Sequence, residues 1–196
     1  MEKKKIICIC GESCSGKDTL TRLAFNNKGS KMNIICSYTT RPKREYEING
    51  VEHWFITDKE ADELISNNTI LAYTSIGEYR YFTLLETLSE NENVYIIDPL
   101  GLKNSLLPLV YKDKLDVCII YIDTPKFIRD YRSKKRKDKE DVYAKRKESE
   151  EKQFNAFRKE LKLKVYKNQH IIHNIFGFKK YNAEKIYNIA NDFLNK

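Results

Sequence analysis

The chain has 196 residues, of which 41% are apolar, with a formal net charge of +8 and five cysteines. This length suits one compact domain, and we find neither a signal-peptide pattern nor an apolar stretch long enough to cross a membrane. Because the cysteines show neither zinc-site spacing nor a disulfide framework, we predict a cytoplasmic protein in a reducing compartment.

The positive charge is concentrated in residues 129–147, where ten basic residues stand against four acidic ones. Nucleic-acid-binding surfaces usually interleave aromatic and basic side chains, and the aromatic residues of this segment are only Tyr131 and Tyr143. The composition therefore favours a small polyanionic substrate over nucleic acid as the partner.

The first predicted element is a strand over residues 4–10, which leads into a glycine-bounded loop and then a helix over residues 18–25. The loop has the pattern Gly-x-x-x-x-Gly-Lys, ending at Lys17. Such a loop directs backbone N–H groups and a helix dipole at an anion, and its lysine reaches the β- and γ-phosphates of a nucleoside triphosphate. We predict that ATP binds to Gly11, Ser13, Ser15, Gly16, Lys17, Asp18 and Thr19. The alternative is an ordinary glycine turn between a strand and a helix.

The residue after the lysine is usually a Ser or Thr that holds Mg²⁺, and here Asp18 takes that place with Thr19 next. Carboxylate and hydroxyl oxygens are hard ligands of the kind that Mg²⁺ prefers. We therefore predict Asp18 and Thr19 as metal ligands, directly or through water. Thr19 could instead cap the helix.

Four further apolar runs predict strands that are buried on both faces, over residues 33–37, 94–98, 117–123 and 171–174. Helical patterns separate these strands, including a long charged helix over residues 142–165 and a C-terminal helix through residues 183–193. The alternation predicts an α/β fold with a five-stranded parallel sheet flanked by helices.

Residues 38–90 have a different sequence pattern, which indicates short strands rather than long apolar runs. Their patterns predict strands at 54–56, 71–73 and 79–82, a helix from Asp58, as its cap, to Asn67, and a hairpin at Gly77-Glu78. We predict one domain with a core of residues 1–37, 91–131 and 147–196, an inserted β-rich lobe of residues 38–90 and a basic lid of residues 132–146, whose charge density suggests a mobile flap.

The segment 37–50 places Arg41 and Arg44 three residues apart beside several hydroxyl groups and near an acidic residue. Two guanidinium groups can hold one phosphate monoester, although a solvated charged loop is the simpler reading. The segment reads S-x-T-T-R-x-x-R-x-x-E-x-x-G and resembles the guanylate kinase family, and this resemblance extends over most of the chain.

The resemblance implies a P-loop NTPase-type fold with a nucleoside monophosphate (NMP)-binding lobe and a lid, and the use of ATP and Mg²⁺. It also implies that Ser37, Arg41, Arg44 and Tyr81 bind the acceptor phosphate, while Glu47 supports the two arginines. His53 stands where the family has a further phosphate-binding tyrosine, so its contact would depend on pH. A histidine without a role in binding is the alternative at that position.

Base recognition departs from the family pattern, because Ala72 stands where the family has a guanine-binding glutamate. Thr83 and Asp98 retain the family's other base-contacting groups, whereas Ile96 replaces the first aspartate of a pair. A lost hydrogen-bonding group changes discrimination by orders of magnitude, so guanine is not assured as the acceptor base.

The family's lid arginines fall on Arg132, Arg136 and Arg146, which the resemblance assigns to charge stabilisation in the transition state. Asn174 falls on the family's adenine-side residue. A lysine-rich solvated helix and an ordinary turn asparagine are the respective alternatives.

The leading hypothesis is an ATP-dependent nucleoside monophosphate kinase, with GMP and dGMP as the first candidate acceptors. A kinase of a phosphorylated sugar is the second hypothesis, because the ribose bisphosphate phosphokinases also carry Gly-Lys-Asp in this loop. A non-catalytic phosphopeptide-binding module is the third, and Lys17 with both loop glycines disfavours it. The expected assembly is a monomer or a homodimer.

Overall fold

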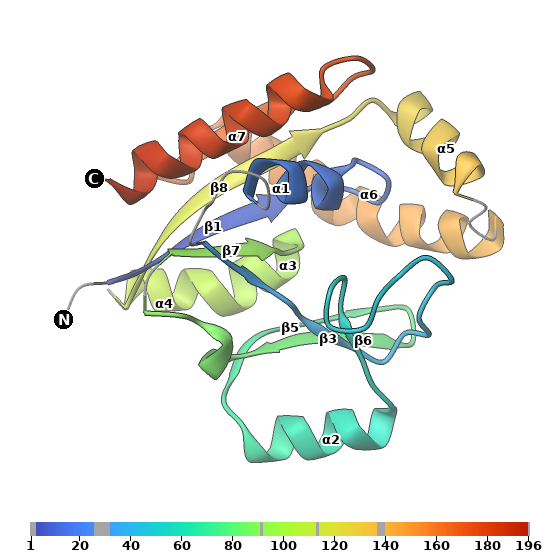
Figure 1. Cartoon of the computed structure of the whole chain (residues 1–196), viewed down its shortest axis with the longest axis vertical. Helices are drawn as coiled ribbons and strands as arrows, with labels where there is room; N and C mark the ends of the chain where they lie inside the picture. Colours follow the sequence, from blue (N-terminus) through green and yellow to red (C-terminus); the bar gives the residue numbers. More distant parts are fainter. Residues whose placement is uncertain (1–2, 26–31, 91, 113, 137–139, 196) are drawn as a thin grey trace.

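The structure is a computed structural model that describes residues 3–25, 32–90, 92–112, 114–136 and 140–195 (Figure 1). Its central sheet has five parallel strands among these residues, in the order β2-β7-β1-β8-β9. The strands are β1 Lys4–Cys10, β2 Asn33–Ile35, β7 Glu92–Ile96, β8 Leu115–Asp123 and β9 Gln169–His173. This confirms the predicted parallel sheet, and β1 lies in its middle.

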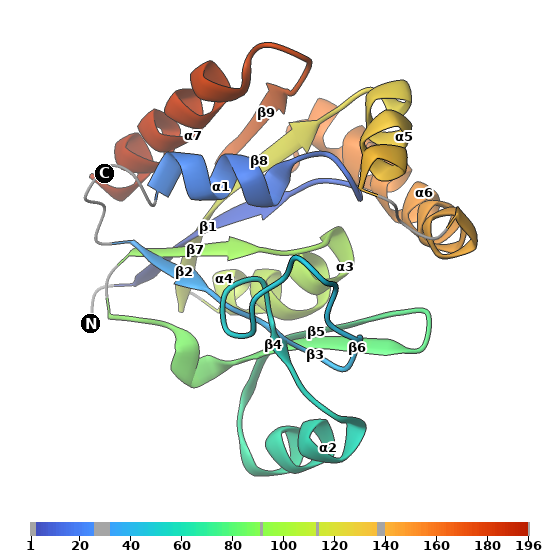
Figure 2. The ribbon, with the colours of Figure 1, turned by 45° about the vertical axis from the view of Figure 1, so that its right-hand side comes forward.

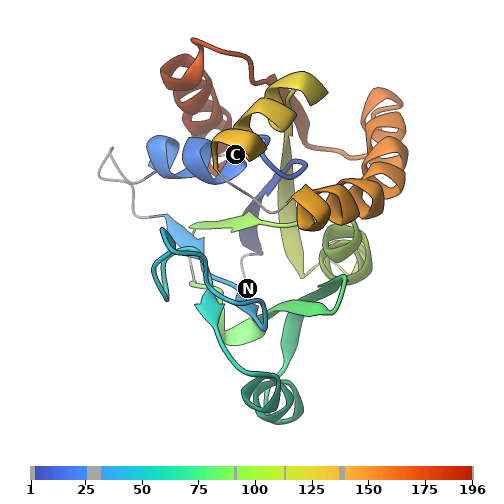
Figure 3. The same ribbon diagram turned by 90° about the vertical axis from the view of Figure 1, so that its right-hand side faces the viewer.

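Helices cover both faces of this sheet, as Figures 2 and 3 show. On one face, Ile7 and Ile9 of β1 pack with α1 (Lys17–Phe25) and α7 (Lys179–Leu194). Ile6 and Cys8 face the opposite side and pack with α6 (Glu140–Lys162) and the helical segment after β7. Alternation of side chains along β1 thus serves two cores, which explains why the strand is continuously apolar.

The segment after β7 was not delimited by the sequence patterns. It forms α3 (Pro99–Gly101), the π-helical turn η2 (Leu102–Leu106) and α4 (Leu107–Tyr111). The Asp98 carboxylate accepts hydrogen bonds from the N–H groups of Leu100 and Gly101, at 2.9 and 3.1 Å, and Pro99 occupies the first turn. An N-cap aspartate followed by proline is a strong start signal for a helix.

Helix α5 (Lys126–Lys135) follows β8 and ends with Arg136 as its C-cap. Helix α6 begins at Glu140 and ends at Lys162, three residues before the predicted end, and Lys164 nearby has a positive φ of 53°. The predicted flap therefore consists of the end of α5, the start of α6 and residues 137–139, which lie outside the described residues.

The inserted lobe has its own four-stranded sheet, which lies beside the core with α2 on its far side (Figure 1). Its elements are β3 Tyr38–Thr39, β4 Trp54–Phe55, α2 Asp58–Asn67, β5 Ile70–Ile76, β6 Tyr79–Leu84 and the short helix η1 Leu85–Thr87. The predicted hairpin is confirmed, because Gly77 takes a φ of 62° between β5 and β6.

The prediction that Asp58 caps α2 is wrong, because Thr57 is the cap. The Thr57 hydroxyl accepts from the Glu60 N–H at 3.2 Å, and the Glu60 carboxylate accepts from the Thr57 N–H at 2.7 Å. This reciprocal capping box satisfies two N–H groups, whereas Asp58 belongs to the first turn, where its charge favours the helix dipole.

Across the described residues, no helix combines the length and the apolar character that a membrane crossing requires.

Candidate active site

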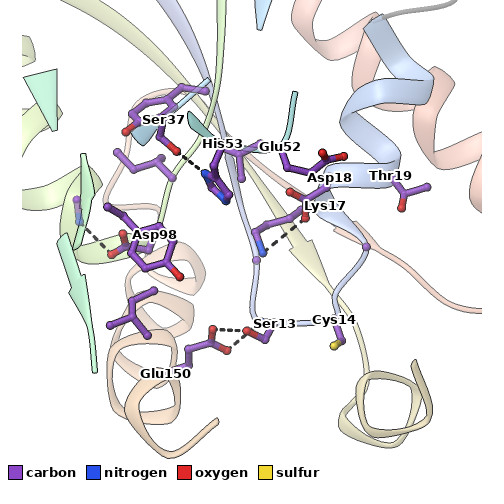
Figure 4. A pocket seen from close by; sticks show the side chains of 18 of the residues that line it. Ser13, Cys14, Lys17, Asp18, Thr19, Ser37, Glu52, His53, Asp98 and Glu150 are labelled. Atoms are coloured by element: carbon purple, nitrogen blue, oxygen red, sulfur yellow. Dashed lines mark hydrogen bonds and ion pairs between the residues drawn. The ribbon is translucent and has the colours of Figure 1, made fainter. Parts of the chain in front are cut away.

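One cavity of about 610 Å³ lies between the core and the inserted lobe. It is lined by most of the predicted site residues, namely Gly11, Ser13, Gly16, Lys17, Asp18, Thr19, Ser37, Arg41, Arg44, Glu47, His53, Tyr81, Asp98, Arg132 and Arg136. The glycine-bounded loop and the two-arginine segment, which the sequence predicts as two anion sites of one cleft, therefore line one space. Figure 4 shows part of this cavity, with Lys17 on one side and Ser37 and Asp98 on the other.

The glycine-bounded loop connects β1 to α1 and is held from behind through one carbonyl group. The Ser15 carbonyl accepts hydrogen bonds from Thr124 Oγ1, Arg132 Nη1 and Asn174 Nδ2, at 2.9, 2.9 and 2.7 Å. In a trans peptide the N–H points opposite to the C=O, so the N–H of Gly16 points away from these three side chains. Gly16 itself has a φ of 88°, which suits glycine.

A buried carboxylate fixes the same loop at its start. Glu12 accepts from Tyr121 Oη at 2.9 Å and pairs with Arg158 at 2.9 Å and Arg129 at 3.0 Å. Burial alone would lower the pKa of Arg158, but its hydrogen bonds to Glu12 and Tyr121 raise it. Burial and the neighbouring Glu12 also raise the pKa of Tyr121. The sequence reasoning missed Glu12, because its partners come from three distant elements.

Lys17 and Asp18 stand at the start of α1, and the lysine Nζ lies 3.9 Å from the Asp18 carboxylate. Desolvation alone would raise the pKa of Asp18, but Lys17 and the backbone N–H at the start of the helix hold this pKa below its usual value. Asp18 and Thr19 are both exposed at the cavity. In the part of the chain that the structure describes, no three His, Cys, Asp or Glu residues gather into a metal site. Mg²⁺ held by Asp18 or Thr19 would take its other ligands from water and phosphate oxygens.

Glu47 holds the two arginines of the opposite wall. Arg41 donates two hydrogen bonds to the Glu47 carboxylate, at 2.7 and 2.8 Å, and Arg44 donates through its backbone N–H at 2.8 Å and its guanidinium at 3.2 Å. Against the effect of desolvation, these bonds lower the pKa of Glu47 to about 2. Within the described residues, the buried Nε of Arg41 has no hydrogen-bond acceptor. Glu47 thus fixes both arginines, and the Nε of Arg41 remains as a donor.

His53 lies between the two walls of the cavity (Figure 4). Its Nδ1 is 2.9 Å from Ser37 Oγ, and its ring packs against the Tyr81 ring with centroids 5.7 Å apart. Desolvation and the nearby Arg41 lower the pKa of His53 to about 4. The ring is therefore neutral at neutral pH while the cavity is empty of anions.

The far end of the cavity is lined by Ala72, Tyr95 and Asp98. Thr83, the predicted base contact, is fully buried, and its hydroxyl lies 2.7 Å from Tyr95 Oη. Tyr95 lines the cavity and Thr83 does not. Thr83 therefore has its hydroxyl engaged by a residue of the cavity lining and is not part of that lining itself.

The predicted lid and adenine-side residues divide into three groups. Arg132 and Arg136 line the cavity, and Arg132 also donates to the Cys14 carbonyl at 3.2 Å. Asn174 is buried and is not part of the cavity lining. Ser15, a predicted residue of the loop, is also buried outside the lining, and within the described residues its Oγ has no hydrogen-bond partner. The side chain of Arg146 lies outside those described.

Sequence reasoning did not single out several residues that line the cavity, namely Arg22, Glu52, Tyr95, Glu150, Gln153 and Phe154. Phe154 was detectable, because it forms a helical apolar stripe with Phe157 of the buried core on α6. The charged members gave no local signal, because their partners come from other elements: Arg22 of α1 pairs with Glu52 at 2.6 Å.

The family model described as guanylate kinase matches residues 3–171. A guanylate kinase from Mycoplasmopsis pulmonis (strain UAB CTIP) is 33% identical over 134 residues, which cover 65% of this chain and 67% of that protein. A guanylate kinase from Mycoplasmoides gallisepticum is 37% identical over 95 residues, 46% of this chain and 49% of that protein. The match thus spans two thirds of the first relative and about half of the second.

The crystal structure of guanylate kinase from Anaplasma phagocytophilum has the same fold. It matches this structure with a TM-score of 0.64 over 100% of this chain and 90% of that one, at 18% sequence identity.

Proposed function

Since the chain belongs to the guanylate kinase family, we propose that it transfers the γ-phosphoryl group of ATP to a nucleoside monophosphate, with GMP and dGMP as the first candidate acceptors. The observation that carries the proposal is one cavity that is lined by Lys17 from the core and by Arg41 and Arg44 from the inserted lobe. Two anion sites that share one cavity can align a donor and an acceptor phosphate for in-line transfer.

The donor side would act through the glycine-bounded loop. Its N–H groups and Lys17 would bind the triphosphate, and Arg132 and Arg136 would stabilise charge on the transferring group. Mg²⁺ at Asp18 or Thr19 would supply further positive charge to the phosphates. Positive groups suffice here, because phosphoryl transfer to a phosphate oxygen needs no general base.

The acceptor side would act through the pair that Glu47 fixes. Arg41 has an unused Nε donor in addition to the guanidinium nitrogens that Glu47 occupies, and Ser37, Tyr81 and His53 lie around the same space. A phosphate dianion placed beside His53 would raise its pKa toward neutrality, because the anion stabilises the imidazolium. The acceptor grip would therefore tighten as the pH falls toward 6.

The part of the cavity lined by Ala72, Tyr95 and Asp98 would hold the base of the acceptor. Position 72 carries no carboxylate, so this region favours a substrate that binds without one. Ala72 offers a methyl group, whereas Tyr95 Oη and the Asp98 carboxylate remain for hydrogen bonding. We therefore expect a smaller preference for guanine than a pocket with a glutamate would give. The same feature keeps a phosphorylated sugar as the second candidate acceptor.

The experiment is a coupled assay of ADP release with ATP, Mg²⁺ and a panel of ribo- and deoxynucleoside monophosphates, extended to sugar phosphates. We expect turnover with at least one purine monophosphate. Lys17→Met should reduce kcat by about 100-fold, since it removes charge from the transferring phosphoryl group. Arg41→Ala should raise the acceptor KM, whereas Lys59→Ala on the exposed face of α2 should change neither constant.

The same assay can also give results that contradict the proposal. Turnover of sugar phosphates alone would transfer the assignment to the second candidate. An absence of turnover with every acceptor, despite ATP binding measured by calorimetry, would overturn the kinase proposal and favour a binding module.

A further inference from the structure

Glu150 of α6 places a carboxylate on the glycine-bounded loop. One of its oxygens accepts from the Ser13 N–H at 2.8 Å, and the other accepts from the Ser13 hydroxyl at 2.6 Å. The two residues are 137 positions apart in the sequence, and Glu150 is only 8% exposed. Figure 4 shows this contact at the end of the cavity near Cys14.

The contact lies on the cavity side of the loop. Ser13, Lys17 and Glu150 all line the same cavity, so the carboxylate shares the space in which phosphates would bind. A backbone N–H supplies one donor, and a carboxylate that takes it withholds it from a phosphate oxygen. A negative charge beside an incoming polyanion also repels it, and more strongly in a partly buried site than in water.

Contacts other than those of Glu150 also hold the loop. Arg129 and Arg158 hold Glu12 at its start, and three donors hold the Ser15 carbonyl. Those contacts hold Glu12 before Ser13 and Ser15 after it, and the Glu150 side chain takes part in none of them. Glu150 is therefore not the loop's only support, and its charge can have a further role.

We propose that Glu150 sets the donor affinity: its carboxylate occupies the Ser13 donors in the absence of nucleotide, and a triphosphate binds only by displacing it. This inference rests on the proposed donor site, and it assigns to that site a residue that weakens binding. Displacement also favours release of the nucleoside diphosphate product, because the carboxylate can return to Ser13 as the phosphates leave.

The test measures binding of inorganic tripolyphosphate and of a non-hydrolysable ATP analogue by calorimetry, in the full chain. Glu150→Gln keeps the size of the side chain and a hydrogen bond to Ser13 but removes the charge. We expect it to bind tripolyphosphate about tenfold more tightly than the wild type, which corresponds to about 1.4 kcal/mol. Adenosine, which is uncharged, should bind equally to both.

Glu148→Gln is the matched control, because it removes the same charge from an exposed position of α6. It should change tripolyphosphate affinity by less than about twofold, since exposed charges are screened by salt. Glu150→Ala is the second variant, and it should also tighten binding, as the charge is lost there too.

Equal or weaker tripolyphosphate binding by Glu150→Gln, with normal binding by the wild type, would overturn this inference and leave the kinase proposal intact. Failure of the wild type and both Glu150 variants to bind any triphosphate would instead overturn the donor site itself, and the inference with it.

Discussion

Glu47 is the residue that decides where two guanidinium groups of the acceptor wall lie. Its side chain is 4% exposed and that of Arg41 is 8% exposed. Buried charges of this kind are stable only in pairs, and loss of one partner leaves the other uncompensated. The carboxylate therefore supports the proposed acceptor site, although the acceptor would touch only the arginines.

We expect Glu47→Gln to raise the acceptor KM by about tenfold and to lower the free energy of unfolding by about 2 kcal/mol, because Arg41 loses its charged partner. The donor KM should stay unchanged. Steady-state kinetics and urea unfolding would check both effects, with the exposed Glu45→Gln as the control. A rise of both KM values together would contradict a role confined to the acceptor side.

His53 makes stability depend on pH in a defined direction. Its pKa is about 4 in the folded chain and near its ordinary 6.5 when the chain unfolds, so the unfolded state binds the proton first as the pH falls. Burial disfavours the imidazolium most and Arg41 next, Asp18 and Glu47 partly offset them, and Lys17 disfavours the imidazolium to a smaller extent. Stability is therefore complete above pH 6.5 and decreases toward pH 4.

At pH 5 the loss should be about 2 kcal/mol relative to pH 7.5, and His53→Gln should abolish most of it. Thermal and urea unfolding between pH 7.5 and 5 would measure this loss of stability. The stabilising contribution of Glu47 is lost only at lower pH, so it does not interfere in this window. His170→Gln, at an exposed position, should retain the wild-type dependence. An unchanged profile in His53→Gln would mean that other groups carry the acid sensitivity.

At the scale of elements, helix α2 depends on its capping box. Thr57→Ala removes the acceptor of the Glu60 N–H, and we expect it to cost about 1 kcal/mol of stability. Glu63→Gln, exposed on the same helix, should cost far less. Urea unfolding of the two variants measures the difference. Equal stability of the wild type and Thr57→Ala would show that the capping box contributes nothing in this lobe.

An ion pair links α1 of the core to the lobe: Arg22 lies 2.6 Å from Glu52, which also accepts from the Ile48 N–H at 2.7 Å. Because Arg22 is 38% exposed, its contribution should be modest. A double-mutant cycle with Arg22→Met and Glu52→Gln should give a coupling energy of about 0.5 kcal/mol. Each single variant should also raise the acceptor KM, since the pair holds the loop that carries His53. A coupling energy of zero with unchanged KM values would rule out this link.

At the scale of the whole molecule, the two proposed anion sites belong to one cavity between core and lobe. A compound that joins adenosine and an acceptor nucleoside through five phosphates should therefore bind at least about 100-fold more tightly than ATP, because the second site is engaged intramolecularly. Arg41→Ala should remove most of that gain without weakening ATP. Calorimetry would measure both, and equal affinity for ATP and the joined compound would mean that the sites act separately.

The sequence by itself determined the parallel sheet, the glycine-bounded loop and the two-arginine segment, because each is coded by neighbouring residues. Continuous apolar runs require burial on both faces, and the loop needs glycine and lysine at fixed spacing. The capping of α2 was misplaced by one residue, since Thr57 and Asp58 are both good caps and the reciprocal bond to Glu60 selects between them.

Only the tertiary structure decided which side chains meet in the cavity. Tyr95 covers Thr83, and Glu150 reaches Ser13 from 137 residues away. Neither contact leaves a periodic pattern, because a hydrogen bond between distant elements depends on how the sheet and helices pack rather than on the local spacing of residues.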